Sequence, residues 1–286
     1  MFSLFIALLI NGIAIGLLYA LMAFGLSIIK GLLNIPNFAH GAFFAIGAYI
    51  CYGALNAGLP FFVALLLSFA VPALVGVAVE RLGLSRLMRE SYLYQLLFLF
   101  AVALVLEQLL LIIFGTVGLS VNPPESLAGA FNLGFTYVPK YLVLNGVVAA
   151  LTIVAVWLLI ERTRLGARIR AGIDKPDMAR CLGVNVNRLL VLGFALGTGL
   201  AGFAGGLALP LLGASPTIGS DMLAIAFVVL VIGGLGSIYG AILAGLLVGI
   251  IQSVATLWVP AASTVLIYVA MVLTLIVRPQ GLLGER

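Results

Sequence analysis

Long apolar runs, separated by short polar or proline-containing breaks, dominate this chain from one end to the other. A helix that crosses the hydrocarbon core of a bilayer needs about 20 consecutive apolar residues. Measured against that length, the runs predict nine helical segments that cross or enter a membrane. Their approximate ranges are 4–29, 37–56, 60–80, 94–114, 141–160, 189–212, 221–234, 237–257 and 262–277.

Composition supports a membrane location for these segments. The 286 residues are 64% hydrophobic and only 8% charged, whereas a soluble domain carries about 25% charged residues. No soluble fold covers so much apolar surface. The runs are continuous rather than alternating with period two, which disfavours a transmembrane β-barrel. We therefore expect an all-α polytopic membrane protein with about 8–9 transmembrane or broken helices, folded as a single domain over residues 1–286.

One polar stretch, residues 161–188, interrupts the apolar pattern. It holds ten of the 23 charged residues of the chain, seven of them Lys or Arg, and charge-free runs lie on both sides. Because positive charge collects in the cytoplasmic loops of membrane proteins, we expect a cytoplasmic loop here. Charge alone favours a solvated loop that only sets the topology. The alternative is a surface that docks another protein.

The same rule orients the rest of the chain. Two further positive groups consist of Arg81, Arg86 and Arg89, and of Arg278 with Arg286. Even numbers of predicted segments separate the three groups, so all three fall on the cytoplasmic side. Counting back places the N-terminus outside and the C-terminus in the cytoplasm. The loop at 116–140, which has few charges, is then external.

Two stretches read as helices interrupted by a polar, proline-containing break. The first lies within 30–42 and contains Pro36. The second lies within 209–222 and contains Pro210 and Pro216. By the topology above, the first break is near the cytoplasmic side and the second near the external side. Such breaks at corresponding positions of two halves are typical of inverted-topology repeats and mark transport pathways, so we expect inverted-repeat character.

Polar residues inside the predicted segments are candidates for the pathway. They are Asn34, Asn37, His40, Glu107, Asp221 and Gln252. An ionisable group within a membrane is costly and marks a functional site by default. For Glu107 the equal alternative is a hydrogen bond between helices, with Gln108, or a protonated carboxyl. His40 also fits a polar group satisfied by a neighbouring helix or by the freed backbone of the break. Asn34, Asn37 and Asp221 also suit helix caps.

Glycine spacing indicates close packing between helices. The chain has 34 glycines, many separated by four positions, as in Gly12–Gly16, Gly193–Gly197 and Gly245–Gly249. Small residues at this spacing let helix backbones approach closely in lipid. The run GGLGSIYG at 233–240 predicts a tight turn between two of the segments.

No motif for catalysis or nucleotide binding accompanies these segments. The sequence lacks the G-x-x-x-x-G-K-[ST] phosphate loop, so we do not expect this chain to hydrolyse ATP. It shows neither a nucleophile beside a base nor a cluster of metal ligands. We therefore expect no catalytic residues, no metal site and no enzymatic activity.

Four stretches resemble the LIV-type permeases of ABC importers, the membrane subunits of branched-chain amino-acid uptake systems. These are NFAHGAFFAIGAY (37–49), RTRLGARIRA…DMARCLGVNVNR (162–188), VLVIGGLGSIYGAILAGLLVG (229–249) and RPQGLLG (278–284). They appear in the order and spacing of the family, nearly from end to end. At one position this chain has Ala42 where some relatives carry an acidic residue. The resemblance therefore indicates the family more strongly than it indicates the substrate.

The resemblance implies a permease of the type II ABC importer class in the bacterial cytoplasmic (inner) membrane. Its partners would be a second related permease, two cytoplasmic ATP-binding subunits and an external or periplasmic solute-binding protein. ATP would bind to the partner subunits, so this chain would hold no cofactor. The implied substrates are branched-chain or related amino acids, with urea or short amides as an alternative. Whether the chain pairs with a different permease or with itself stays open; the family implies a different one.

The resemblance also places an ATPase-coupling element near 174–183. The residues themselves fit a short docking helix, with Pro176 in its first turn, Asp174 as N-cap and Gly183 as terminator. The negative charge of Asp177 near the helix start and the positive charge of Arg180 near its end would interact favourably with the helix dipole. The predicted coupling residues are Asp174, Pro176, Asp177, Met178, Arg180, Leu182 and Gly183.

A different class of function is a self-sufficient secondary transporter, driven by protons through Glu107 or His40. The chain offers too few ionisable groups within its apolar segments for a proton relay. A docking loop would also have no purpose in such a protein. Uptake by this chain alone in a proton gradient would favour this class.

Overall fold

The structure is a computed structural model that describes residues 2–88, 90–132, 134 and 136–284. Each of the nine predicted segments forms a helix, because a chain in lipid must satisfy its backbone polar groups internally. The helices are α1 (Phe2–Leu33), α2 (His40–Asn56), α3 (Phe61–Val79), α5 (Tyr92–Phe114), α6 (Lys140–Arg162), α9 (Val186–Leu212), α10 (Ile218–Gly233), α11 (Ile238–Trp258) and α12 (Ser263–Val277).

Six of these helices are long and apolar enough to span a membrane, namely α1, α3, α5, α6, α9 and α11. Among the described residues, the helices α2, α10 and α12 have only 17, 16 and 15 residues. At 1.5 Å per residue, α2 is about 25 Å long, less than the roughly 30 Å of a bilayer core. The estimate of 8–9 spanning or broken helices thus divides into six long spans and three shorter helices.

Short elements complete the fold at the ends of the bundle. A π-helical turn, η1 (Glu80–Leu84), and α4 (Ser85–Leu87) extend α3. Two helices form within the polar stretch, α7 (Arg164–Asp174) and α8 (Pro176–Cys181). Single 3-10 turns occur at η2 (Glu125–Leu127) and η3 (Pro260–Ala262).

The expectation of an all-α chain is corrected in one detail. Residues 116–140 contain a two-stranded antiparallel hairpin in which β1 (Ala130–Asn132) pairs with β2 (Tyr137–Pro139). The turn between them is stabilised by Asn132, whose Oδ1 accepts a hydrogen bond of 2.8 Å from the backbone N–H of Gly134. Such local side-chain bonding favours turns over helix.

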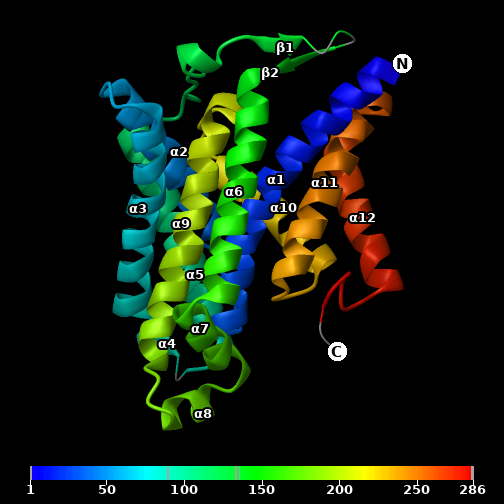
Figure 1. The fold of residues 1–286 in the computed structure, drawn as a ribbon. Helices are drawn as coiled ribbons and strands as arrows, with labels where there is room; N and C mark the ends of the chain where they lie inside the picture. The colour runs from blue at the N-terminus through cyan, green and yellow to red at the C-terminus, as the bar shows by residue number, and fades with distance from the viewer. Residues whose placement is uncertain (1, 89, 133, 135, 285–286) are drawn as a thin grey trace.

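The bundle has two distinct ends, and Figure 1 shows what each carries. The basic end carries α4, α7 and α8, with the C-terminal segment on the same side. The hairpin end carries β1 and β2 together with the start of α1. Arg81, Arg86 and Arg278 therefore share a side with the polar stretch, as the charge pattern predicted. Arg89 and Arg286 lie outside the described residues.

The core of the bundle is formed by α2, α9 and the part of α1 from Leu18 to Ile29, which is buried throughout. Helix α2 is buried from His40 to Tyr49, and α9 is buried from Gly197 to Leu209 apart from Phe203. By contrast, α5 and α12 present mostly exposed leucine, isoleucine, valine and phenylalanine side chains. An apolar surface of this extent is what a bilayer covers.

Glycine contacts hold α1 against α11. A Cβ atom added to Gly16 would lie 2.9 Å from the carbonyl oxygen of Gly245, and one added to Gly245 would lie 2.6 Å from Cα of Ala20. No real side chain fits at these distances, so the backbones touch only because the residues are glycine. The predicted four-residue glycine spacing is confirmed for this helix pair. The tight turn is confirmed as well, since α10 ends at Gly233 and α11 begins at Ile238.

The two breaks open at opposite ends of the bundle. Helix α1 ends at Leu33, and the chain then returns into the bundle, so that His40 Nε2 lies 3.0 Å from the carbonyl oxygen of Met22 on α1. At the hairpin end, Ala214 follows α9 and pairs with Leu119 through two backbone hydrogen bonds of 2.7 Å. The breaks therefore lie at opposite ends, as the topology predicted.

The helices that follow the two breaks meet at their first turns. A Cβ atom added to Gly219, in the first turn of α10, would lie 2.8 Å from the carbonyl oxygen of Gly41 in the first turn of α2. Nearby, the rings of Phe38 and Phe227 pack in a tilted arrangement with centroids 5.3 Å apart. The start of α2 and the first half of α10, which are far apart in the sequence, therefore contact each other.

Candidate functional site

The polar stretch ends in a short, well-terminated helix, α8. Its first turn contains Pro176, as predicted, which suits a position where a backbone N–H has no partner. The prediction of Asp174 as N-cap is wrong. Lys175 occupies the N-cap position without a side-chain cap, and Asp174 is the last residue of α7. The side chains of Asp174 and Pro176 lie outside the described residues. The backbone N–H groups of Lys175 and Ala179 bond to the carbonyls of Ala171 and Lys175, which links α7 directly to α8.

Gly183 ends α8 through a Schellman motif, as the sequence predicted for a terminating glycine. Its φ angle is +80°, in the left-handed region where a side chain is strained. The N–H of Gly183 bonds to the carbonyl of Arg180 at 3.0 Å, and the N–H of Val184 bonds to the carbonyl of Ala179 at 3.0 Å. These two bonds satisfy carbonyls that every helix end leaves without a partner.

Helix α8 presents apolar side chains at the basic end. Met178 is 63% exposed and Leu182 is 83% exposed, whereas Ala179 is buried. Asp177 and Arg180 form an ion pair of 2.9 Å on the same helix. Large apolar side chains exposed at the end of the bundle are typical of a surface that contacts another protein, whereas a solvated loop has no need of them.

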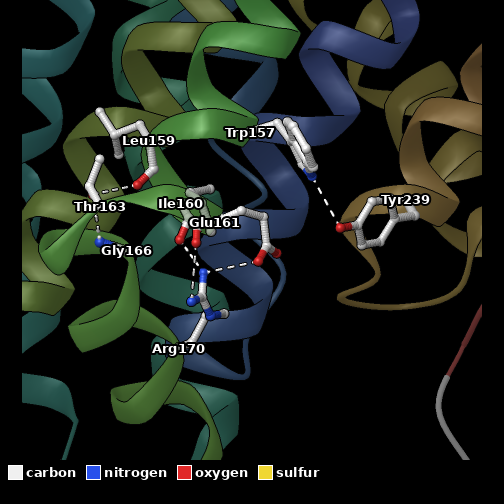
Figure 2. Close-up of polar contacts among 8 residues, drawn as sticks. All are labelled: Trp157, Leu159, Ile160, Glu161, Thr163, Gly166, Arg170 and Tyr239. Atoms are coloured by element: carbon white, nitrogen blue, oxygen red, sulfur yellow. Dashed lines mark hydrogen bonds and ion pairs between the residues drawn. The ribbon is translucent and has the colours of Figure 1, made fainter.

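Helix α7 begins at a side-chain cap that sequence reasoning missed. Thr163 takes the N-cap position, and its Oγ1 accepts a hydrogen bond of 3.1 Å from the N–H of Gly166. The same hydroxyl donates to the carbonyl of Leu159, in the last turn of α6, at 2.5 Å. Figure 2 shows this double contact. A threonine directly before a helix start is the signal that could have revealed the cap.

Arg170 reaches from α7 back to the end of α6, as Figure 2 shows. Its Nη1 donates to the carbonyl of Ile160, and its Nη2 donates to the carbonyl of Glu161 at 3.5 Å. Its Nη1 also lies 3.2 Å from the Glu161 carboxylate. A cation at a helix C-terminus interacts favourably with the free carbonyls and the helix dipole.

Gly166 brings α7 close to α6. A Cβ atom at this position would overlap the backbone of Ile160, so the two helices touch through glycine. On the same side of α7, Ile169 is buried at 2% exposure. We call the contact region Leu159–Arg170 the α6–α7 junction. It fixes the direction in which the polar stretch leaves the bundle.

A further contact ties α6 to a distant helix at the basic end. The Nε1 of Trp157 donates a hydrogen bond of 3.1 Å to the hydroxyl of Tyr239, in the first turn of α11. Figure 2 shows the two side chains reaching toward each other from separate helices. The last turns of α6 are thus joined both to α7 and to α11.

The structure does not gather the six predicted pathway residues into one cluster. Asn34 is exposed at the end of α1, with φ of +56°, and its side chain accepts from Lys30 Nζ at 2.6 Å. It therefore ends the preceding helix and does not cap the one that follows. Asparagine tolerates this left-handed conformation better than most residues. Gln252 instead joins α11 to α1, because its Oε1 accepts a hydrogen bond of 2.7 Å from Tyr19.

Asn37 and His40 are fully buried at the first break. The Oδ1 of Asn37 accepts from the N–H of Ala39 at 3.0 Å, which makes a local turn rather than a cap of α2. His40 Nε2 contacts the Met22 carbonyl, as the packing interpretation of this residue predicted. Within the described part of the chain, Asn37 Nδ2 and His40 Nδ1 have no partner.

Glu107 lies beside the second break. With Gln108 on α5 and Pro216 and Thr217 before α10, it lines a pocket of about 490 Å³ whose other walls are apolar. Neither Glu107 nor Gln108 makes a hydrogen bond to another helix in the described residues, so the interhelical interpretation finds no support. Asp221 is exposed in the first turn of α10 and caps nothing, because Thr217 holds the N-cap position.

These observations define a multi-pass helical membrane protein with two interrupted helices at opposite ends of the bundle and an exposed, basic end. The model of the family "branched-chain amino acid transport system / permease component" matches residues 8–275. The chain therefore belongs to this permease family. The family comprises permease components, so the chain is the membrane subunit of an ABC transport system and not its enzyme.

Individual relatives agree with the family. The chain is 31% identical to the high-affinity branched-chain amino acid transport system permease protein BraD of Pseudomonas aeruginosa, over 97% of this chain and 95% of that protein. It is 27% identical to the permease protein LivH of Escherichia coli K12, over 99% and 97%. It is 30% identical to the permease protein LivM of the same organism, over 93% and 68%. No solved structure matches this chain.

Proposed function

We propose that this chain carries branched-chain or related amino acids across a bacterial inner membrane, in step with ATP hydrolysis by partner subunits that dock on α8. The docking proposal rests on the exposed side chains of Met178, in α8, and of Leu182, at its C-cap. The Schellman motif at Gly183 holds the end of this helix. The similarity to BraD, LivH and LivM, all permease proteins of branched-chain amino acid transport systems, supports the substrate class.

The proposed assembly contains four kinds of subunit. Two cytoplasmic ATP-binding subunits would seat α8, and an external or periplasmic solute-binding protein would deliver the substrate. A second, related permease would pair with this chain in the membrane. This chain is similar to two permease proteins of one organism, LivH and LivM, which supports a pair of related permeases. ATP would bind only to the cytoplasmic subunits, so this chain would hold no cofactor.

The basic end would face the cytoplasm, with the N-terminus outside and the C-terminus inside. Arginines at η1, α4, α7 and α8 gather at this end, and positive charge is retained on the cytoplasmic side. The whole chain would act as one permease domain. The coupling residues are Asp174, Pro176, Asp177, Met178, Arg180, Leu182 and Gly183.

The substrate pathway would pass the pocket that contains Glu107 and Thr217. A carboxylate on the partly exposed face of a spanning helix is too costly to leave against lipid, so a second permease and a hydrated pathway would cover it. Alternating access would then work through the two breaks, as in inverted repeats of the type II importer class. Replacement by Glu107→Gln should lower uptake without loss of assembly, whereas Glu125→Gln in the hairpin-end loop should not. Equal uptake in both variants would remove Glu107 from the pathway.

The docking proposal is tested by reconstituting the permease pair with its ATP-binding subunits and measuring ATP hydrolysis stimulated by loaded binding protein. Gly183→Arg should abolish stimulation, because a side chain at φ of +80° disrupts the end of α8. Gly115→Arg is the matched control. Gly115 also follows a helix at φ of +81°, has nothing within 4 Å of its Cβ position, and lies at the hairpin end.

The control separates docking from general strain. Stimulation lost in Gly183→Arg and kept in Gly115→Arg would support coupling through α8. Stimulation kept in both variants would refute it. Uptake by the purified chain alone in a proton gradient, without ATP, would replace the importer with a secondary transporter.

A further inference from the structure

Helix α6 ends in contacts with side chains of the segment that follows it. No glycine follows it, and Thr163 leaves the last turn with extended backbone, φ −107° and ψ 159°. The carbonyls of a last turn need partners from elsewhere. The carbonyls of Leu159, Ile160 and Glu161 receive them from side chains of Thr163 and Arg170. The start of α7 therefore completes the end of α6.

The opposite end of α6 is held by a buried hydrogen bond to α9. The hydroxyl of Tyr141, in the first turn, donates a hydrogen bond of 2.8 Å to the carbonyl of Leu207 on α9. Both residues are buried, at 2% and 0% exposure. Leu207 lies five residues before Leu212, where α9 ends and the second break begins. Tyr141 thus fixes α6 to the helix that leads into this break.

Between these two points α6 is an uninterrupted helix. Its 23 residues span about 34 Å at 1.5 Å per residue. It runs close to α1, since a Cβ atom on Gly146 would lie 3.3 Å from Cα of Ala14. A helix of this length, fixed at one end to α7 and at the other to α9, is a stiff connection between the basic end and the second break.

We propose that α7 and α6 move as one lever that carries a displacement of α8 to the second break, with Arg170 and Tyr141 as positioning residues at its two ends. The proposal rests on the docking function proposed for α8. It adds the route by which a motion at α8 reaches the pocket of Glu107 and Thr217.

The contribution of Arg170 lies in its donors rather than in its ion pair with Glu161. Both side chains of that pair are partly exposed, at 39% and 30%, and exposed pairs contribute little. The donors to the two backbone carbonyls have no substitute among the described side chains. Arg170→Gln should therefore weaken the α6–α7 junction, whereas Glu161→Gln should leave it intact. Arg170→Lys, which keeps one charged donor, should give an intermediate result.

The experiment uses the complete complex in proteoliposomes and measures substrate molecules taken up per ATP hydrolysed. Arg170→Gln should lower this ratio about tenfold, the upper part of the range seen for residues that couple distant sites. Arg168→Gln is the control, because Arg168 is exposed on the same helix and makes no hydrogen bond or ion pair in the described part of the chain. Tyr141→Phe should lower the ratio as well, with Tyr137→Phe on exposed β2 as its control.

The outcomes separate the lever from the docking function. A wild-type complex that couples, with Arg170→Gln and Tyr141→Phe coupling equally well, would overturn the lever and leave docking intact. A wild-type complex without stimulated hydrolysis would instead overturn docking. Complexes that no longer co-purify in both variants would also overturn the lever, because Arg170 and Tyr141 would then serve assembly alone.

Discussion

Two helix ends within the polar stretch satisfy their free carbonyl groups by different means. Helix α8 ends on Gly183, and backbone N–H groups from the following residues satisfy its carbonyls. Helix α6 ends without glycine, and side chains from α7 satisfy its carbonyls. A backbone cap depends on one residue that can adopt positive φ. A side-chain cap also ties two helices together, so it constrains the direction of the second helix.

The strongest test of this difference is Gly166→Ala. The new Cβ would overlap the backbone of Ile160, and backbone cannot yield as a flexible side chain does. We expect a loss of roughly 1–3 kcal/mol in unfolding free energy, seen as a lower midpoint of thermal unfolding in detergent. Gly172→Ala is the matched control on the same helix, where the nearest atom is a leucine methyl group at 3.3 Å. Equal midpoints for the two variants would show that the α6–α7 junction is not closely packed.

An intermediate effect is expected from Thr163→Val. Valine keeps the shape but removes the hydroxyl that accepts from Gly166 N and donates to the Leu159 carbonyl. Loss of an N-cap costs about 1 kcal/mol, and hydrogen exchange of the first amides of α7 would report it. Thr274→Val provides the comparison, because Thr274 only bonds to the Ala270 carbonyl within α12. Unchanged exchange in α7 would contradict the cap.

The smallest effect is expected within α8, from Asp177→Asn in its first turn. Asp177 pairs with Arg180 at 2.9 Å, but the two side chains are 91% and 55% exposed. Such pairs contribute about 0–1 kcal/mol and weaken with salt. Unfolding midpoints at low and high salt should differ little from the wild type. A marked, salt-sensitive loss would mean that charge, and not the Gly183 motif, holds α8.

Much of the fold could be predicted from the sequence, because lipid restricts the chain so strongly. Nine apolar runs became nine helices, and the positive groups that the structure describes gathered at one end. Chain direction and charge suffice for such predictions. The start and end signals at Pro176 and Gly183 were also recognisable, since both act through their own backbone.

Predictions that depended on neighbours in space were less successful. Asp174 and Asp221 were interpreted as caps because acidic residues suit helix starts, yet other residues took those positions. Asn34 was interpreted either as a cap of the following helix or as a pathway residue, and in the structure it follows the end of α1. The pathway candidates Glu107, His40 and Gln252 look alike in the sequence, as polar residues in apolar runs. The structure separates them into a surface pocket, a buried break and a contact between α1 and α11.

The sequence by itself determined the class of protein, the family and the division into apolar helices and one basic stretch. Those properties follow from composition, periodicity and local motifs, which can be recognised without knowing which distant residues lie close together in space. Only the tertiary structure decided that Arg170 completes the end of α6 and that Tyr141 holds its start against α9. A carbonyl at a helix end accepts whichever donor the fold brings within reach, and that donor has no fixed spacing along the chain.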